Sequence, residues 1–335
     1  MQAAGATLIT TIDYHTAGEP FRIVTGGAPD IPGATVLDRR EAAATGPADA
    51  LRALLCNEPR GHADMYGCFL VPPSPGAHLG VLFWHKDGFS TACGHGTIAL
   101  GVYAVDAGLV DAPADGTVEV VIDVPSGRVT ARVAREAGRT RSVSFVNVPS
   151  FVGSRDVPVS TSRGELRVDL SYGGAFYASA RAADAGLSVA PADLPALIAT
   201  GREVRDALNE VGAARHPTDP RLDGVYGTIW YDELSGRSDT VHQRNCTVFA
   251  DGEVDRSPCG SGTSARLVLL HDSGVLPVGA TLRHDGIVGT TFLGRVVGRS
   301  DDGVLTEVTG MAYRTGEHRF VLDPDDPIGD GFQLR

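Results

Sequence analysis

The sequence is poor in lysine: Lys86 is the only one, beside 28 arginines. Enzymes that use pyridoxal phosphate hold this cofactor as a Schiff base on a lysine side chain. Lys86 lies in residues 84–88, Trp-His-Lys-Asp-Gly, which we expect to form a polar turn. The scarcity of lysine therefore argues against a pyridoxal phosphate enzyme and favours chemistry that needs no cofactor.

The chain also lacks a long apolar run and a basic surface. No stretch approaches the length that spans a bilayer, so we expect no membrane partner. The formal charge of −12 disfavours nucleic acid as a partner, because phosphate recognition needs clustered Lys and Arg. Residues 1–11 contain neither a basic segment nor a cleavage-like tripeptide, so we expect a cytoplasmic protein.

Cysteine is scarce as well, and the five cysteines do not form a disulfide pattern. They are Cys56, Cys68, Cys93, Cys246 and Cys259. An odd number without paired spacing indicates free thiols in a reducing compartment. The sequence contains no CxxC motif, and the Cys-x-His at residues 93–95 lacks a second local pair, so we expect no metal site.

One short motif, by contrast, is present twice. Residues 93–97 read Cys-Gly-His-Gly-Thr, and residues 259–263, at an offset of 166, read Cys-Gly-Ser-Gly-Thr. The likeness extends beyond the motif, since a phenylalanine precedes each cysteine by ten residues and an aspartate follows by thirteen. A constant offset across half the chain predicts two related halves, each carrying one thiol at the same structural point.

The length of 335 residues suits two domains, and the hydrophobic content of 42% is that of a globular protein. We predict a first half over residues 1–148, which carries Cys93, and a second half over 149–309, which carries Cys259. A C-terminal strand, at about 310–335, can return to the first half.

Most of the chain has the pattern of short strands. Runs rich in β-branched residues between Gly, Pro and Asp turns predict a β-rich fold in both halves. Helical periodicity is clearest over residues 50–56 and 194–211 and in the segments that follow the two cysteines. Each cysteine thus stands between a strand and a helix, and a glycine, Gly108 or Gly274, ends that helix.

A cysteine at a helix start has a direct chemical use. The first backbone N–H groups of a helix lack intrahelical partners, and the helix dipole places partial positive charge there. This field lowers the pKa of a thiol, and the glycines let a bound carboxylate approach the backbone. Two such thiols on opposite faces of one substrate predict a racemase or epimerase, with Asp255 placed to hold the ammonium of an amino acid.

Other interpretations remain open from the residues alone. Each motif can be a buried cysteine in a glycine-rich turn, although the duplication weakens that interpretation. A binding module that has lost catalysis is opposed by the presence of both thiols. A dinucleotide-binding oxidoreductase is opposed by the missing G-x-G-x-x-G spacing after a strand.

The chain resembles the proline racemase family, which includes proline racemases, 4-hydroxyproline 2-epimerases and trans-3-hydroxy-L-proline dehydratases. The segments that carry the resemblance are residues 15–20 (HTAGEP), 58–62 (EPRGH), 64–67 (DMYG), 93–97, 172–177 (YGGAFY) and 255–260 (DRSPCG). The resemblance implies an α+β fold of the diaminopimelate-epimerase type, with two pseudo-symmetric halves and the active site in the cleft between them. It also implies a small-molecule substrate, proline or hydroxyproline, no cofactor and a homodimer as a possible assembly.

The resemblance implies roles for nine residues. Cys93 and Cys259 are the expected acid–base pair. The expected substrate-binding residues are Gly94, His95, Gly260 and Ser261 for the carboxylate, Asp255 for the ring nitrogen, and Phe249 and Tyr66 as walls of the pocket.

The branch of the family is less clear from the sequence. Residues 172–177 and 226–229 resemble the dehydratase branch, yet dehydratases usually carry threonine where this chain has Cys259. Epimerisation needs a proton donor on each face of the substrate, whereas dehydration needs one base for the α-proton. Both thiols being present, we predict a racemase or epimerase acting at C2, with trans-3-hydroxy-L-proline dehydratase as the alternative.

Overall fold

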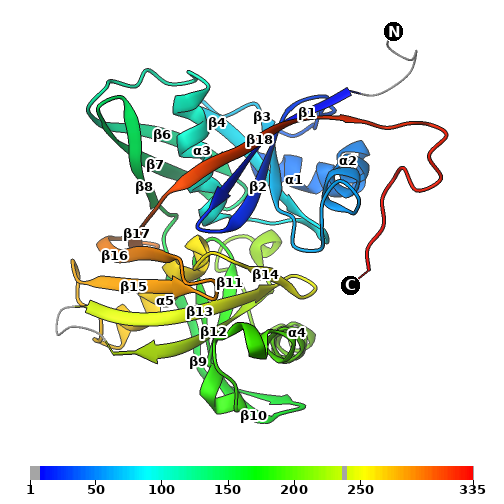
Figure 1. Ribbon diagram of the computed structural model, residues 1–335. Helices are drawn as coiled ribbons and strands as arrows, with labels where there is room; N and C mark the ends of the chain where they lie inside the picture. Colours follow the sequence, from blue (N-terminus) through cyan, green and yellow to red (C-terminus); the bar gives the residue numbers. More distant parts are fainter. Residues whose placement is uncertain (1–7, 236–239, 335) are drawn as a thin grey trace.

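The computed structural model describes residues 8–235 and 240–334, which form two halves, one above the other in Figure 1. In each half, strands surround one central helix, α3 (Gly94–Asp106) in the first and α5 (Gly260–Asp272) in the second. Each of these helices is buried over its first eleven residues. The expected α+β architecture with two halves is therefore confirmed.

The strands of the two halves correspond one to one. Those of the first half are β1 (Leu8–Thr16), β2 (Glu19–Gly26), β3 (Gly67–Val71), β4 (Leu79–His85), β5 (Gly88–Phe89), β6 (Gly116–Val124), β7 (Gly127–Glu136), β8 (Arg139–Val146) and β18 (Ala312–Val321). Those of the second are β9 (Phe151–Thr161), β10 (Gly164–Tyr172), β11 (Phe176–Arg181), β12 (Val225–Leu234), β13 (Thr240–Phe249), β14 (Glu253–Asp255), β15 (Thr281–Gly286), β16 (Thr291–Ser300) and β17 (Gly303–Gly310).

The parallel and antiparallel strand pairs follow the same order in both halves, and this repetition is the pseudo-symmetry of the fold. From β1 to β8 the sheet has parallel pairs at β2–β3 and β4–β6. From β10 to β17 it has parallel pairs at β11–β12 and β13–β15. The remaining neighbours in both series pair antiparallel.

The C-terminal strand completes the first half. β18 pairs antiparallel with β1, as β9 pairs antiparallel with β10 in the second half. A further antiparallel pair, β8 with β17, joins the two halves. We propose residue 148 as the boundary, because it lies between β8 and β9 and leaves each half with a matching set of strands.

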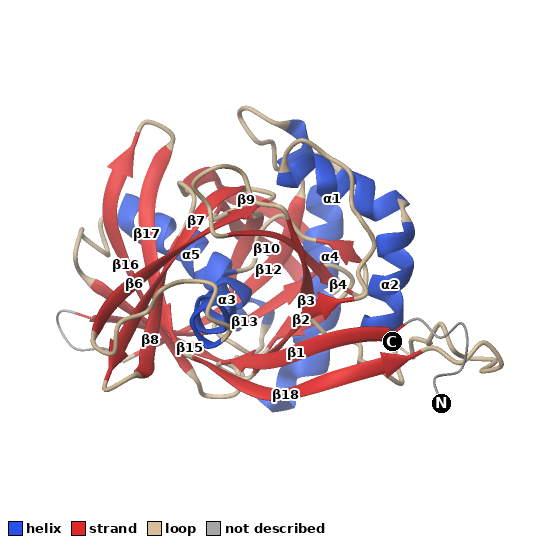
Figure 2. Cartoon of the chain, turned by 90° about the horizontal axis from the view of Figure 1, so that it is seen from above, coloured by secondary structure: helices blue, strands red, loops and turns tan. Residues whose placement is uncertain are grey.

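Three further helices lie outside the central pair: α1 (Val36–Thr45), α2 (Pro47–Cys56) and α4 (Leu194–Glu210). Figure 2 shows α1 and α2 together at one side of the molecule. Short 3₁₀ turns are η1 (Ala182–Ala185), η2 (Pro191–Asp193) and η3 (Pro220–Leu222). The predicted helices correspond to α2, α3, α4 and α5. The structure adds α1, in which charged residues 38–41 interrupt the apolar spacing that would indicate a helix.

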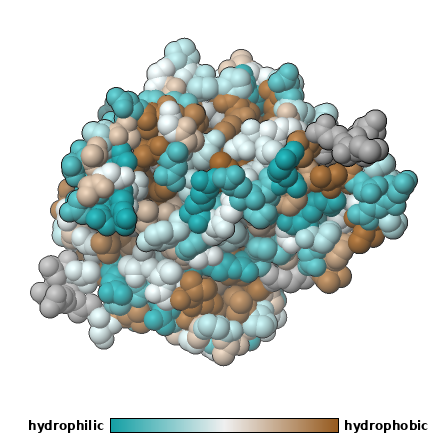
Figure 3. All heavy atoms as spheres, turned by 45° about the horizontal axis from the view of Figure 1, so that its top comes forward, coloured by the Kyte–Doolittle hydropathy of each residue, from teal (hydrophilic) through white to brown (hydrophobic). Residues whose placement is uncertain are grey.

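The surface combines hydrophobic and hydrophilic residues, and the cysteines outside the repeated motif lie in the core. In Figure 3, hydrophobic residues form several separate patches among hydrophilic ones. Cys56, Cys68 and Cys246 are fully buried, as expected for core residues. Within the described ranges, no helix combines the length and the apolar character needed to cross a membrane.

Candidate active site

Both motif cysteines occupy the N-cap position of a central helix. The Cys93 Sγ accepts a hydrogen bond from the Gly96 N–H at 3.2 Å, at the start of α3. The Cys259 Sγ accepts from the Gly262 N–H at 3.3 Å, at the start of α5. The repeat in the sequence therefore corresponds to a repeat in structure, and each thiol contacts the positive end of a helix.

The two helix starts approach each other so closely that only glycine fits. A Cβ atom on Gly94 would lie 2.5 Å from the Gly260 Cα, and one on Gly260 would lie 2.6 Å from the Gly94 Cα. The first amides of both helices, which lack intrahelical partners, therefore lie side by side. Such a pair of helix N-termini is suited to bind one carboxylate between them.

The residues expected to form the site line one narrow cavity between the halves. Eight of the nine predicted residues line it, and Gly260 contacts Gly94 behind them. Both thiols are more than nine-tenths buried. Four further residues line the cavity that were not among the predicted site residues: Ala92, Tyr177, Tyr226 and Thr247. Tyr177 and Tyr226 lie in segments that carried the resemblance, which was the one signal for them.

Aromatic rings form one wall of this cavity. Tyr226 stacks on Phe249 with ring centroids 5.5 Å apart, and Tyr66 packs edge-on against His95 at 4.9 Å. The Tyr66 hydroxyl hydrogen bonds with Ser90 and lies 3.4 Å from the Tyr226 hydroxyl. This wall offers an apolar surface to a small ring and hydroxyl groups to a ring substituent.

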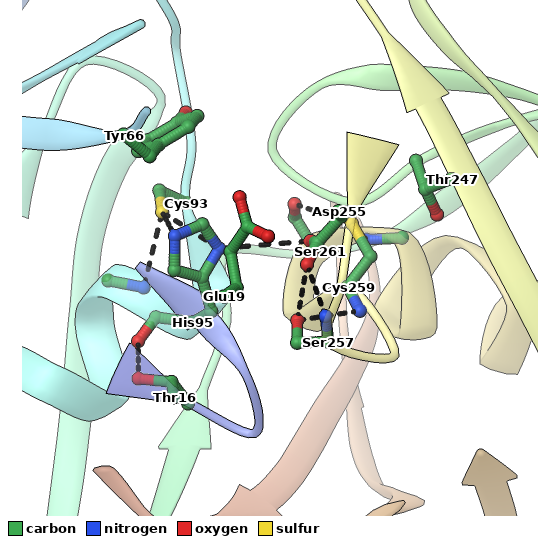
Figure 4. Close-up of polar contacts among 12 residues, drawn as sticks. Thr16, Glu19, Tyr66, Cys93, His95, Thr247, Asp255, Ser257, Cys259 and Ser261 are labelled. Atoms are coloured by element: carbon green, nitrogen blue, oxygen red, sulfur yellow. Dashed lines mark hydrogen bonds and ion pairs between the residues drawn. The ribbon is translucent and has the colours of Figure 1, made fainter. Parts of the chain in front are cut away.

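Asp255 is the carboxylate of the cavity, and it is almost fully buried. One oxygen accepts hydrogen bonds from the Ser257 N–H at 2.8 Å and from the Ser257 hydroxyl at 2.6 Å. The other lies 3.7 Å from the His95 Nδ1 (Figure 4). Burial raises the pKa of Asp255 to about 6, and burial lowers the pKa of His95 to about 3. At neutral pH the site thus has an ionised Asp255 beside a neutral imidazole.

The expectation of thiols with a lowered pKa is wrong for the closed site. Burial raises the pKa of Cys93 and of Cys259 well above the ordinary value for a thiol. The N–H groups of the helix starts lower both pKa values, and the Asp255 charge raises both. Desolvation is the larger effect because both sulfur atoms lie away from water.

Cys259 has a backbone conformation that L-residues rarely adopt, with φ of +60°. Such conformations cost about 1–3 kcal/mol and persist where the surrounding structure enforces them, often at functional sites. Here the preceding segment, Asp255 to Pro258, is held by contacts to the first half, among them the Arg256–Asp64 ion pair at 2.8 Å. The strain fixes the direction of the Cys259 thiol.

One group of potential metal ligands lies behind the aromatic wall. Among the described residues, His85, Asp87 and Glu253 are the one trio of this kind whose donor atoms all lie within 4.8 Å of one another. The Lys86 ammonium donates to Asp87 at 2.9 Å and brings positive charge to the group. An ammonium and a metal ion repel each other, so we regard the group as a polar contact between the halves.

Comparisons with known proteins agree with this geometry. The family model described as proline racemase matches residues 11–333. A Bacillus thuringiensis protein named trans-3-hydroxy-L-proline dehydratase is 43% identical, covering 97% of this chain and 98% of the relative. Further relatives with that name are 41–45% identical. A Burkholderia multivorans protein named 3-hydroxyproline 2-epimerase is 44% identical, covering 98% of each chain.

Solved structures give the same result for the fold. The chain is similar to a hydroxyproline epimerase from Agrobacterium vitis, solved with bound trans-4-hydroxy-L-proline, with a TM-score of 0.89 and 31% identity over 98% of this chain and 96% of that one. Proteins of the PhzF type, at 12% identity and a TM-score of 0.58, share the fold alone. The expected diaminopimelate-epimerase-like fold is confirmed, and the chain belongs to the proline racemase family.

Proposed function

We propose that the protein is a trans-3-hydroxy-L-proline dehydratase that uses the Cys93 thiolate as its base. The names of the full-length relatives support this alternative better than the racemase or epimerase that the sequence analysis preferred. The observation that carries the proposal is the buried thiol of Cys93 at the start of α3, in a cavity where the N-termini of α3 and α5 face each other.

The stereochemistry of this substrate makes one thiol sufficient for loss of water. In trans-3-hydroxy-L-proline the hydroxyl lies opposite the carboxylate, so the α-hydrogen and the hydroxyl share a face of the ring. The Cys93 thiolate removes the α-proton, and the C–H electron pair forms a C2=C3 bond as the C3–O bond breaks. The thiol returns the proton to the departing oxygen, which leaves as water, and the enamine then tautomerises to a cyclic imine.

The surroundings of the thiol support α-proton removal. The amides of the two helix starts would hold the carboxylate and stabilise the negative charge that develops on it, as oxyanion-type donors do. Asp255 would hold the ring nitrogen as an ammonium. Because both thiols and Asp255 are almost fully buried, these charge interactions are stronger than they would be in solution.

Epimerisation at C2 is the second candidate, and Cys259 is the observation that favours it. This thiol lines the same cavity and can donate a proton to the opposite face of a planar carbanion. The Burkholderia relative named 3-hydroxyproline 2-epimerase supports this candidate. Which product forms depends on whether the hydroxyl leaves before Cys259 delivers its proton.

Incubation in deuterated water followed by NMR separates the two candidates. We expect trans-3-hydroxy-L-proline to give the cyclic imine, while L-proline and trans-4-hydroxy-L-proline gain at most α-deuterium. Accumulation of cis-3-hydroxy-D-proline without imine would reject the dehydratase in favour of the epimerase.

The Cys259→Thr variant is the matched control for this experiment. It should dehydrate trans-3-hydroxy-L-proline within about threefold of the wild-type rate, because threonine leaves the base on the other face untouched. The same variant should lose any epimerisation, since the threonine hydroxyl is a much weaker acid than a thiol and donates its proton poorly.

A further inference from the structure

Glu19, the first residue of β2, is a buried carboxyl group beside the cavity to which the sequence analysis gave no role. It has no exposed surface, and one of its oxygens accepts a hydrogen bond from the Arg256 N–H at 2.7 Å. Among the described residues the other oxygen, Oε1, has no hydrogen-bond partner. A buried ionised carboxylate with an unsatisfied oxygen is costly, whereas a neutral carboxylic acid is much less so.

Among the described residues, the cation that acts on Glu19 is Arg256, whose charge lowers the pKa of Glu19 by less than burial raises it. In Figure 4 its carboxyl group lies between His95 on one side and Asp255 on the other. The Arg256 guanidinium is bound by Asp64 at 2.8 Å and by the Val254 carbonyl at 2.8 Å. His95 is neutral because of its burial. The other ionisable neighbours are acids: the Asp255 and Asp64 charges raise the pKa of Glu19, and Cys93 is a thiol whose pKa the Glu19 charge raises.

Glu19 and Asp255 therefore compete for one negative charge, and their surroundings differ. Asp255 accepts two short hydrogen bonds from Ser257, and Glu19 accepts one, from a backbone amide. Hydrogen bonds stabilise the charged form of a carboxyl group, and two nearby carboxylates disfavour double ionisation. Burial, and after it the Asp255 charge, raises the pKa of Glu19 well above its ordinary value.

We infer that Glu19 carries a proton in the working enzyme, so that the amine side of the site presents one carboxylate, Asp255, instead of two. The inference rests on the proposed function in one respect, namely that the substrate brings a single ammonium. One carboxylate balances that ammonium. A second negative charge would oppose the Cys93 thiolate, since a charged Glu19 raises the pKa of Cys93. Glu19 is thus a positioning residue that controls charge through its neighbours.

Infrared spectroscopy of the wild type and of Glu19→Gln tests the inference directly. At neutral pH the difference spectrum should contain the C=O band of one protonated carboxyl group from Glu19. Taking the difference between variants removes the signal of Glu253, another buried acid whose pKa burial raises. If Glu19→Gln is not recovered as folded protein, Glu19→Met, of similar volume, should lose the same band.

Kinetics give a second readout that a merely structural role would not produce. Glutamine resembles a protonated glutamate, so kcat/KM of Glu19→Gln should stay within about threefold of wild type at neutral pH. The ratio of variant to wild type should rise with pH, because only wild type acquires a second charge. Absence of the infrared band together with a loss of more than about tenfold at neutral pH would overturn the inference.

The two proposals fail in different ways. The infrared band needs no turnover, so a wild type that has the band but acts on no proline derivative would count against the proposed function alone. A wild type that turns over a hydroxyproline and lacks the band would count against the protonation of Glu19 alone.

Discussion

The two thiol segments share a backbone frame but not their surroundings. Both cysteines cap 13-residue helices, and the strands around them pair in the same order of parallel and antiparallel neighbours. Cys93 is extended, with φ of −154°, and its sulfur lies 3.5 Å from the His95 ring nitrogens. Cys259 has φ of +60° and lies 3.9 Å from the Tyr177 hydroxyl.

The difference shows that a duplicated motif does not imply two equivalent acids. Cys93 lies next to the neutral His95 imidazole, whereas Cys259 lies next to the Tyr177 hydroxyl. Asp255 belongs to the segment that carries Cys259. Chemistry that needs two equal proton donors would favour equal surroundings, whereas a reaction with one main base tolerates unequal ones.

The largest expected effect comes from removing each thiol separately. Cys93→Ala should lose about 10²–10⁴-fold in imine formation from trans-3-hydroxy-L-proline and in α-deuterium exchange. Cys259→Ala should keep most of the imine formation and lose C2 inversion. NMR in deuterated water measures all three. Equal losses of imine formation in the two variants would show that the thiols act as a unit.

The next effect concerns Asp255, the carboxylate that only the second segment has. Asp255→Asn should weaken substrate binding by about 2–5 kcal/mol, because the ammonium loses its charged partner. In wild type, kcat/KM should fall as pH drops through about 6, where Asp255 takes up a proton, and the variant should lack this step.

Ionised Asp255 should favour activity but lower the stability of the fold. Its pKa is raised on folding, so ionised Asp255 lowers the free energy of unfolding above pH 6, and this cost disappears below the pKa of the unfolded chain. Asp255→Asn should therefore raise Tm relative to wild type at pH 7.5 and not at pH 3.5. Equal Tm differences at both pH values would contradict the raised pKa.

A smaller effect is expected where the two segments are alike. Gly94→Ala and Gly260→Ala should each destabilise the protein by about 1–3 kcal/mol, because the added Cβ meets the backbone of the facing helix. Activity should fall with the disturbed carboxylate nest. Gly298→Ala is the control, since its Cβ would meet only Leu305 at 3.8 Å. Chemical denaturation and kcat/KM together distinguish this effect from a general loss of folding.

The smallest effect separates helix capping from chemistry. Thr35 caps α1 by accepting from the Asp38 N–H at 3.1 Å, and Thr35→Ala should cost about 1 kcal/mol without changing kcat. Cys93→Ser should do the reverse, keeping the cap of α3 and losing activity. A Thr35→Ala variant with reduced kcat would show that α1 contributes to the site.

The features that depend on local pattern could be predicted from the amino-acid sequence. The repeat at an offset of 166 located both thiols, both helix starts and the glycines that end the helices, where φ is +65° at Gly108 and +76° at Gly274. Short runs of β-branched residues predicted strands in both halves. Successive side chains of a strand point to opposite faces, so a strand with one buried face alternates apolar and polar residues. The resemblance to the proline racemase family identified the other predicted residues that line the cavity, such as Tyr66 and Phe249.

The groups that meet across the two halves are brought together by tertiary packing, which no local pattern predicts. Tyr177, Tyr226 and Thr247 reach the cavity through pairings of distant strands, and Glu19 reaches the Asp255 segment from the other half. The raised pKa of the thiols follows from burial, which no local pattern records. Spacing along the chain specifies the helices and strands, but desolvation and charge depend on every neighbour that folding brings within a few ångströms.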